Sequence, residues 1–546
     1  MALSRPLVPG RWYWYLVTAA LAALVLVPIG VLVASWKSVD TEIWAHLWDT
    51  QLARVLFNTA VLAAGVGCGV TLLGVGLGWL TSACDFPGRR WLDWALMLPF
   101  AVPAYVLAFV FVGMCDFAGP VQSTLREWFG PGLRFPPVRS TGGVILVLVL
   151  VFYPYVYLLA RSAFLTQGRG FAEAARLLGC TPWRAFWRIA LPVARPAIAA
   201  GVALALMETL ADFGAVSVFN YDTFTTLIYK TWYGFFSLAS AAQLASLLLL
   251  MVLLGVGVER YSRGKIGASQ ERPRIALYKL RGIRAWTASG ACLTVFAVAF
   301  VIPLMQLVLW CWRRGRFDLD ERYLALVGHS LYLAGVVATL AVTAAMSLAL
   351  AKRRAPHPAV RLGVNLANLG YAIPGSVLAV AIMLAFSYLD SAWIIPLARW
   401  FGGAGEPMLL GSLAGLLLAC LARFLTAAHG PLDAALDRLR PALPEAARGL
   451  GVGGARLYWR VHLPLLAPAL SSAALLVFVD VIKEMPATLL LRPFGWDTLA
   501  VRVFEMTSEG EWARASLPAL SLVAVGLLPV VLLIRRSARV PGIPLD

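Results

Sequence analysis

The sequence contains EAARLLGCTPWRAFWRIALPVARPAI at residues 173–198 and EAARGLGVGGARLYWRVHLPLLAPAL at residues 445–470. The two stretches carry the same residue at many positions, each time separated by 272 positions. The matching pairs include Glu173 and Glu445, Gly179 and Gly451, Arg184 and Arg456, Trp187 and Trp459, Pro192 and Pro464, and Pro196 and Pro468. Agreement in register over such a length indicates an internal repeat.

The repeat extends well beyond these stretches. Residues 58–63 (NTAVLA) correspond to 329–334 (HSLYLA) at a separation of 271. The stretch 263–284 lies between the copies and is rich in charged residues, glycine and proline, which is typical of a domain boundary. The sequence therefore predicts a first half at 1–262, a linker at 263–284 and a second half at 285–546.

The composition of the chain is that of a membrane protein. Of its 546 residues, 60% are hydrophobic and 14% are charged, whereas soluble domains carry about 25% charged residues. A bilayer supplies the apolar surroundings that such a chain needs, and each crossing takes about 20 mostly apolar residues. Backbone polar groups in that layer must be satisfied internally, which favours helices. Long apolar runs such as 144–159 argue against a β-barrel.

Twelve apolar runs are long enough to be spans, six in each half. They lie near residues 15–35, 57–82, 92–114, 142–160, 197–217, 240–258, 285–311, 330–350, 365–388, 408–425, 467–490 and 516–534. Because six spans separate equivalent positions, both halves cross the membrane in the same direction. The predicted fold is an all-α integral membrane protein of about twelve transmembrane helices in two homologous six-helix halves.

The distribution of basic residues predicts the orientation. With the N-terminus in the cytoplasm, most Lys and Arg residues fall on the cytoplasmic side, as the positive-inside rule requires, and the C-terminus is cytoplasmic too. The formal net charge of +18 is then explained without nucleic acid as a partner. The seven cysteines include no CxxC pair, so neither a disulfide framework nor a zinc site is indicated.

Both copies of the repeat match the EAA motif, which reads Glu-Ala-Ala, three residues, Gly, nine residues, a β-branched residue, any residue, Leu and Pro. The matching positions are Glu173, Ala174, Ala175, Gly179, Ile189, Leu191 and Pro192, and Glu445, Ala446, Ala447, Gly451, Val461, Leu463 and Pro464. The chain therefore resembles the type I ABC importer permeases. The resemblance implies their fold, an inner-membrane location in bacteria and direct contact with membrane lipid.

In that family the motif couples the permease to its motor. The resemblance implies that loops 173–192 and 445–464 dock into two copies of a cytoplasmic ABC ATPase, with Arg184 and its equivalent Arg456 among the coupling residues. In the first loop the residues able to make charged contacts are Glu173, Arg176, Arg184 and Arg188. The resemblance also implies a periplasmic substrate-binding protein as partner. The residues of the first loop fit a helix, a turn and a second helix, in which Thr181 caps the second helix and Pro182 occupies its first position.

The sequence contains no phosphate-binding loop of the form GxxxxGK[ST] and no HExxH or GxSxG motif. We therefore expect a transport subunit that is not an enzyme and binds no cofactor. ATP and Mg²⁺ would be used by the partner ATPase. The sequence also indicates no metal site at a fixed position.

Two acidic pairs follow the EAA motifs within predicted spans. Glu208 and Asp212 in the first half correspond to Asp480 and Glu484 in the second, again 272 positions apart. A carboxylate at the centre of a bilayer costs about 2.5 kcal/mol or more, so it normally faces a polar cavity or a partner. A spacing of four residues places each pair on one helix face, which predicts that they line the translocation pathway. A structural ion pair between Lys483 and Asp480 is the alternative.

Oxygen ligands suit hard cations such as ferric ion. At a finer level the chain resembles fused ferric-iron permeases, in the stretches METLADFG (207–214), TFTTLIY (223–229) and VFVDVIKEMPATLLLRPF (477–494). Permeases for thiamine, polyamines, sulfate or phosphonate are the alternatives within the class, and an ion-coupled secondary transporter is the alternative outside it. Transport would proceed by alternating access, with helix breaks at Pro99, Pro103 and Pro374 as candidate hinges.

Overall fold

The protein is almost entirely helical. The computed structural model describes residues 12–132, 135–167, 181–263, 278–314, 318–401, 406–439, 442–450 and 454–538. Within these ranges the strands are one short parallel pair, β1 (Cys84–Asp85) and β2 (Tyr278–Lys279). Twelve helical segments of the described residues are long and apolar enough to cross a membrane, as the sequence predicts.

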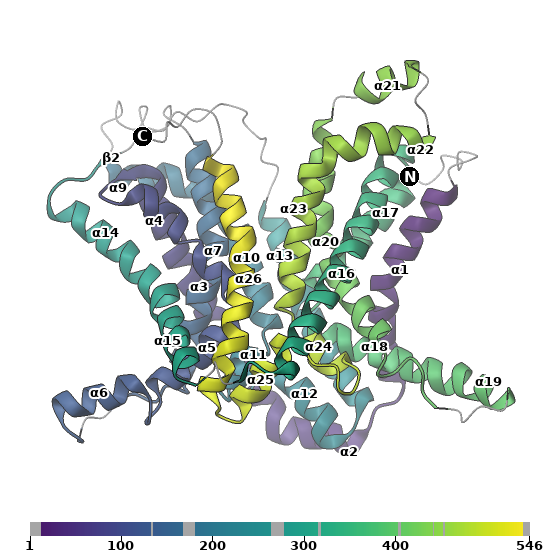
Figure 1. Ribbon diagram of the computed structural model, residues 1–546, viewed down its shortest axis with the longest axis horizontal. Helices are drawn as coiled ribbons and strands as arrows, with labels where there is room; N and C mark the ends of the chain where they lie inside the picture. Colours follow the sequence, from purple (N-terminus) through teal and green to yellow (C-terminus); the bar gives the residue numbers. More distant parts are fainter. Residues whose placement is uncertain are drawn as a thin grey trace. The chain divides into compact units, whose positions relative to one another are not determined.

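The chain forms two compact units (Figure 1). The first unit comprises Met1–Asp40, Thr231–Ser246 and Glu321–Val501. The second comprises Thr41–Lys230, Leu247–Asp320 and Arg502–Asp546. Three helices contribute residues to both units, namely α12 (Phe224–Phe235), α13 (Leu238–Arg263) and α25 (Leu499–Ser508).

The first unit is built around α16, α20 and α23, which pack against one another. Its elements are α1 (Trp12–Ala34), η1 (Ser35–Lys37), α16 (Glu321–Arg354), α17 (Pro358–Ala367), η7 (Asn368–Ala372), α18 (Gly375–Leu389), η8 (Asp390–Ile394), α19 (Ile395–Trp400), α20 (Leu413–Arg438), α21 (Ala442–Gly449), α22 (Gly454–Leu457), η9 (Tyr458–His462), α23 (Leu463–Ile482) and α24 (Pro486–Leu491).

The second unit is built around α3, α7 and α10, which again pack against one another. Its elements are α2 (Thr41–Leu47), η2 (Trp48–Leu52), α3 (Ala53–Ala83), β1, α4 (Arg89–Ala95), η3 (Leu98–Ala101), α5 (Ala104–Cys115), α6 (Pro120–Phe129), α7 (Thr141–Thr166), α9 (Pro182–Ala185), η4 (Phe186–Ala190), α10 (Leu191–Ala211), α11 (Gly214–Val218), β2, α14 (Ile283–Phe296), η5 (Ala297–Val301), α15 (Ile302–Arg313) and α26 (Trp512–Ala538).

The first span of each half packs with helices of the other half. In the first unit α1 lies along α17 and also contacts α16 and α18 (Figure 1). The approach is close, because a Cβ added to Gly363 on α17 would lie 3.3 Å from Cβ of Thr18 on α1. In the second unit α15 contacts α5 of the first half, and it also contacts α26 of its own half. The compact units therefore differ from the halves 1–262 and 285–546, which remain a prediction about the repeat.

Proline interrupts two of the predicted spans. The expected run 92–114 is divided into α4, η3 and α5, and α5 begins directly after Pro103, whose backbone is extended. The expected run 365–388 is divided in the same way, and α18 begins directly after Pro374. The breaks predicted at these prolines are confirmed, and their physical cause is the missing N–H and the fixed φ of proline.

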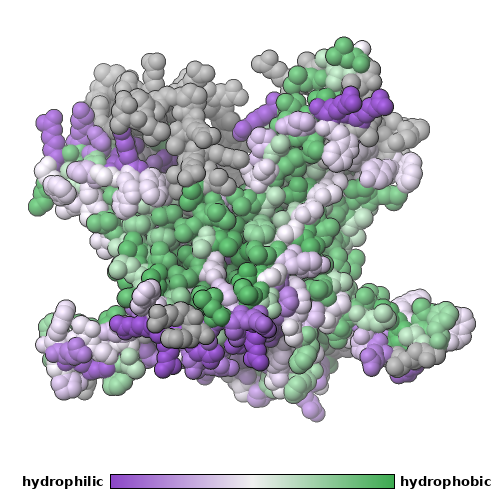
Figure 2. Space-filling view, viewed as in Figure 1, coloured by the Kyte–Doolittle hydropathy of each residue, from purple (hydrophilic) through white to green (hydrophobic). Residues whose placement is uncertain are grey.

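The surface of each unit follows the pattern expected in a bilayer. Figure 2 shows hydrophobic residues over the middle of the long helices and hydrophilic residues near their ends. Many large apolar side chains on the long helices are exposed, among them Phe57, Leu72, Trp286 and Leu254. Because lipid solvates such side chains and water does not, these helices are suited to a membrane.

Candidate functional site

The second EAA loop begins with a short exposed helix. α21 carries Glu445 in its first turn, followed by Ala446 and Ala447, and both Glu445 and Ala446 are exposed. A backbone hydrogen bond of 3.1 Å from Leu450 N to Ala446 O ends the helix, and the Leu450 side chain is 84% exposed. An exposed leucine beside small alanines offers a surface that a protein partner can approach closely. Gly451 lies outside the described residues.

The structure describes the second part of the first EAA loop. Thr181 caps α9, since its Oγ1 accepts a 3.4 Å hydrogen bond from Arg184 N, and Pro182 is the first residue of the helix. The predicted cap and the predicted proline position are therefore confirmed. Arg184 is exposed. Glu173, Ala174, Ala175 and Gly179 lie outside the described residues.

Both loops continue into the membrane through a wide helical turn. The residues Phe186–Ala190 and Tyr458–His462 form π-helical turns at equivalent positions of the repeat. Each turn is followed by a helix with proline near its start, Pro192 in α10 and Pro464 in α23. Proline cannot donate the usual hydrogen bond and its ring crowds the preceding turn, which explains the local widening.

Trp187 and Trp459 are exposed within these turns, and Arg456 is exposed just before the second turn. The tryptophan side chains are equivalent in the repeat and are 53% and 65% exposed. Each loop thus presents a cation and an aromatic ring, both of which are enriched where proteins meet. The two arms of the first loop are also tied together, because Gln167 Nε2 donates to Ala190 O over 3.0 Å.

The first acidic pair lies where α10 ends. α10 includes the half-buried Glu208 and stops at Ala211, so Asp212 is beyond the helix. Asp212 Oδ1 accepts a 3.1 Å hydrogen bond from Val216 N in the short helix α11. Its backbone oxygen accepts a 2.7 Å hydrogen bond from Thr225 Oγ1. The Asp212 carboxylate therefore satisfies a free N–H at the start of α11.

The second acidic pair repeats this arrangement with an added cation. α23 stops at Ile482, and Glu484 Oε1 accepts a 2.9 Å hydrogen bond from Ala487 N at the start of α24. Glu484 Oε2 lies 3.2 Å from Nη1 of Arg423 on α20, and the two side chains are only 5% and 12% exposed. Gly375 leaves the room for this pair, because a Cβ there would lie 2.3 Å from Arg423 Nη1 and 2.5 Å from Glu484 Oε1.

The structure differs from the predicted pathway lining in two respects. The acids of a pair do not share one helix face, because each helix ends between them. The second acid of each pair has a structural contact, and Glu484 is paired with Arg423, a partner that sequence reasoning missed. The half-buried Glu208 and Asp480 lie within their helices, and Asp480 interacts electrostatically with Lys483.

The described residues contain no group of three or more His, Cys, Asp or Glu side chains arranged to hold a metal ion.

Twelve candidate spans among the described residues, with exposed residues in the EAA loops, are the features of a membrane transport protein. Residues 70–262 match the family described as "Binding-protein-dependent transport system inner membrane component". The chain belongs to this family, and its function is that of the transmembrane permease subunit of an ABC importer. It is a multi-pass protein of the inner membrane.

Three relatives illustrate the range of the family. The Fe(3+)-transport system permease protein FbpB 2 of Haemophilus influenzae is 27% identical over 496 residues, which cover 89% of this chain and 90% of the relative. The sulfate transport system permease protein CysW of Escherichia coli is 31% identical over 39% of this chain and 73% of the relative. The molybdenum transport system permease protein ModB of Escherichia coli is 29% identical over 40% of this chain and 99% of the relative.

Proposed function

We propose that this permease moves ferric iron from the periplasm to the cytoplasm. The observation that carries the proposal is the extent of similarity to FbpB 2, which covers 89% of this chain and therefore includes parts of both halves. The sulfate and molybdenum relatives match only 39% and 40% of this chain, which is less than the length of a single half. Carboxylates of the half-buried Glu208 and Asp480 also suit a hard cation.

The proposed mechanism is alternating access. A periplasmic binding protein delivers the cargo, and two copies of an ABC ATPase receive loops 173–192 and 445–464, one loop each. Closure of the ATPase pair on ATP and Mg²⁺ moves the loops, and the helices beyond them change the side to which the pathway opens. The chain itself needs no bound cofactor, and both termini lie in the cytoplasm.

The orientation follows from the charges of the helix ends. α16 ends in Lys352, Arg353 and Arg354, and the loops after α7 and α20 are basic as well. Lys and Arg near span ends favour the cytoplasmic side. The EAA loops then face the compartment that contains ATP, which supports the proposed docking.

Growth of a deletion strain and uptake by vesicles distinguish ferric iron from the alternative cargoes. In a strain that lacks this permease, we expect growth to fail in medium with limiting ferric iron and to recover when the gene is restored. Growth limited by thiamine, polyamine, sulfate or phosphonate should be unchanged. Uptake of radiolabelled ferric iron by vesicles containing the permease and its partners should require ATP. A defect confined to one of the other nutrients would refute the ferric-iron proposal.

The acids within the helices give a second test. Changing Glu208→Gln together with Asp480→Asn should lower the initial rate of iron uptake, because neutral amides attract a cation less than carboxylates do. We expect a decrease of about tenfold, which corresponds to about 1.4 kcal/mol of activation free energy. The rate is measured in vesicles with equal amounts of permease. Glu127→Gln in the exposed part of α6 is the matched control and should leave the rate unchanged. Normal uptake by the double variant would exclude both acids from the pathway.

A further inference from the structure

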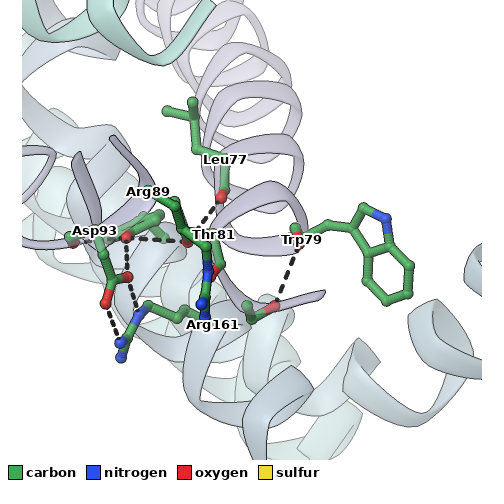
Figure 3. A network of polar contacts seen from close by, with 8 residues as sticks. Leu77, Trp79, Thr81, Arg89, Asp93 and Arg161 are labelled. Atoms are coloured by element: carbon green, nitrogen blue, oxygen red, sulfur yellow. Dashed lines mark hydrogen bonds and ion pairs between the residues drawn. The ribbon is translucent and has the colours of Figure 1, made fainter. Parts of the chain in front are cut away.

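A network of polar contacts joins three helices of the second unit at one end (Figure 3). Arg161 on α7 binds the carboxylate of Asp93 on α4 through two hydrogen bonds of 2.5 Å each. Tyr157, one turn earlier on α7, donates to the backbone oxygen of Asp93 over 2.8 Å. A bidentate contact between guanidinium and carboxylate fixes the angle between the two helices as well as their distance.

The same network includes the end of α3. Arg89 Nε donates to Thr81 O over 2.6 Å, and Thr81 Oγ1 lies 3.2 Å from Tyr157 OH (Figure 3). The side chains of Arg161 and Asp93 are 25% and 23% exposed, so water screens their attraction only in part. α3, α4 and α7 are therefore held as one body at the end of α7 that leads to the first EAA loop.

The first unit has an ion pair near the end of α20, the helix that is equivalent to α7. Lys352 at the end of α16 binds Asp433 on α20 over 2.5 Å, and the side chains are 38% and 21% exposed. The neighbouring Arg353 lies 3.3 Å from Asp437 and donates to the backbone oxygen of Leu436. These contacts fasten the end of α20 that leads to the second EAA loop.

In the repeat, the charged residues on the helices before the two EAA loops are equivalent, whereas their partners are not: Lys352 is equivalent to Thr81, and Asp93 is not equivalent to Lys352. Arg161 and Asp433 are separated by 272 positions, and Thr81 and Lys352 by 271. The charge on the helix before the EAA loop is thus positive in one copy and negative in the other. In both copies this charge meets an opposite charge from the helices packed around it. The residues have changed and the polarity is reversed, but the attachment is present in both.

The helices that carry these charges are the only described route from the membrane into the amino-terminal side of each loop. α7 ends at Thr166, seven residues before Glu173, and α20 ends at Arg438, seven residues before Glu445. A movement of a loop reaches its unit through α7 or α20 on one side and through α10 or α23 on the other. Without a firm attachment near the end that leads to its loop, α7 or α20 would move alone. The helices α5 and α18, which begin after Pro103 and Pro374, would then not move with it.

We propose that Asp93–Arg161 and Lys352–Asp433 are coupling clamps, positioning ion pairs that pass the movement of each EAA loop to the rest of its unit. The inference rests on the proposed alternating access with partner ATPases. A clamp differs from an ion pair that only stabilises the fold, because its loss uncouples the motor from the permease without releasing either partner.

The test uses the full complex of permease, ATPase and binding protein in lipid vesicles. ATP hydrolysis is measured with and without the binding protein, and the amount of ATPase that purifies with the permease is measured in parallel. For Asp433→Lys and for the milder Asp433→Asn and Asp93→Asn, we expect stimulation of hydrolysis by the binding protein to fall by about fivefold or more. The amount of bound ATPase and the unstimulated hydrolysis should stay at the level of the unmodified complex.

The double variant Lys352→Asp with Asp433→Lys restores an ion pair with reversed polarity and should recover most of the stimulation. Asp222→Asn is the matched control, since Asp222 pairs with the 57% exposed Lys230 elsewhere in the second unit, and it should retain full stimulation. Three results would each overturn the proposal that these ion pairs are coupling clamps. They are retained stimulation in the single variants, equal defects in the single and double variants, and a parallel loss of bound ATPase.

Failure of the clamps and failure of the cargo proposal are distinguishable. Stimulated hydrolysis reports on coupling and does not depend on which cargo crosses. If unmodified vesicles respond to the binding protein but accumulate no ferric iron, the cargo proposal fails and the clamps are judged by the stimulation alone. If iron uptake is normal and stimulation survives Asp433→Lys, the clamps fail and the cargo proposal stands.

Discussion

Arg423→Met should prevent stable folding of the permease, with a loss of about 3–5 kcal/mol, because it leaves the buried carboxylate of Glu484 without its cation. The Arg423 and Glu484 side chains are 12% and 5% exposed, so water cannot take the place of the missing guanidinium. Thermal unfolding followed by size-exclusion chromatography in detergent measures the effect, and we expect little folded protein.

A second variant separates loss of the pair from loss of the arginine itself. Arg423→Met combined with Glu484→Gln removes both charges, and the glutamine oxygen still accepts from Ala487 N, so stability should return in large part. Arg502→Met is the control, because Arg502 and Glu505 form a more exposed pair at 3.5 Å, and such pairs contribute about 0–1 kcal/mol. A folded, stable Arg423→Met protein would show that the pair does not hold α20 to the start of α24.

Ala446→Trp should abolish docking of the ATPase at the second EAA loop. Ala446 is exposed on α21, so the larger side chain costs the permease nothing, but it blocks the close approach that alanine permits. We expect the affinity for the ATPase to fall at least about 30-fold, which corresponds to the loss of about 2 kcal/mol of binding free energy. Binding of purified ATPase to permease in lipid nanodiscs measures the change.

The control for this prediction is the same substitution at another exposed alanine. Ala392→Trp alters the helical turn η8, far along the chain from both EAA loops, and should leave ATPase binding unchanged. The unfolding temperature of both variants should match that of the unmodified permease. Full ATPase binding and full iron uptake by Ala446→Trp would contradict the assignment of this loop as a docking element.

The repeated motif and the apolar runs were enough to predict the fold class, twelve spans and the family. The breaks at Pro103 and Pro374 could also be predicted, because proline has a local effect on the backbone. The ends of α10 and α23 were not predicted. Pro486, two residues after Glu484, is a signal for the end of α23 that was not used, whereas no proline follows Asp212 at the end of α10. The acids looked like members of a helix face for that reason.

Contacts between residues that are distant in sequence could not be predicted, for a different reason. Arg423 lies inside the apolar run 408–425, and an arginine there requires a partner, but nothing in the sequence identifies that partner as Glu484. Asp93 and Arg161 lie at the ends of two predicted spans, and their contact depends on how α4 folds back after Gly88, which has a positive φ of 75°. Packing of side chains distant in sequence decides both cases.

The first span of each half packs with helices of the other half, and this arrangement has a consequence for biogenesis. α1 leaves the ribosome before every other described helix, yet the helices that it contacts, α16, α17 and α18, begin only at Glu321. It must wait in the lipid, or with an insertion factor, while most of the remaining spans are synthesised, and contacts between such distant segments form slowly. A gene divided at the linker would yield two polypeptides that each lack a helix required for their own unit, so neither product could mature alone.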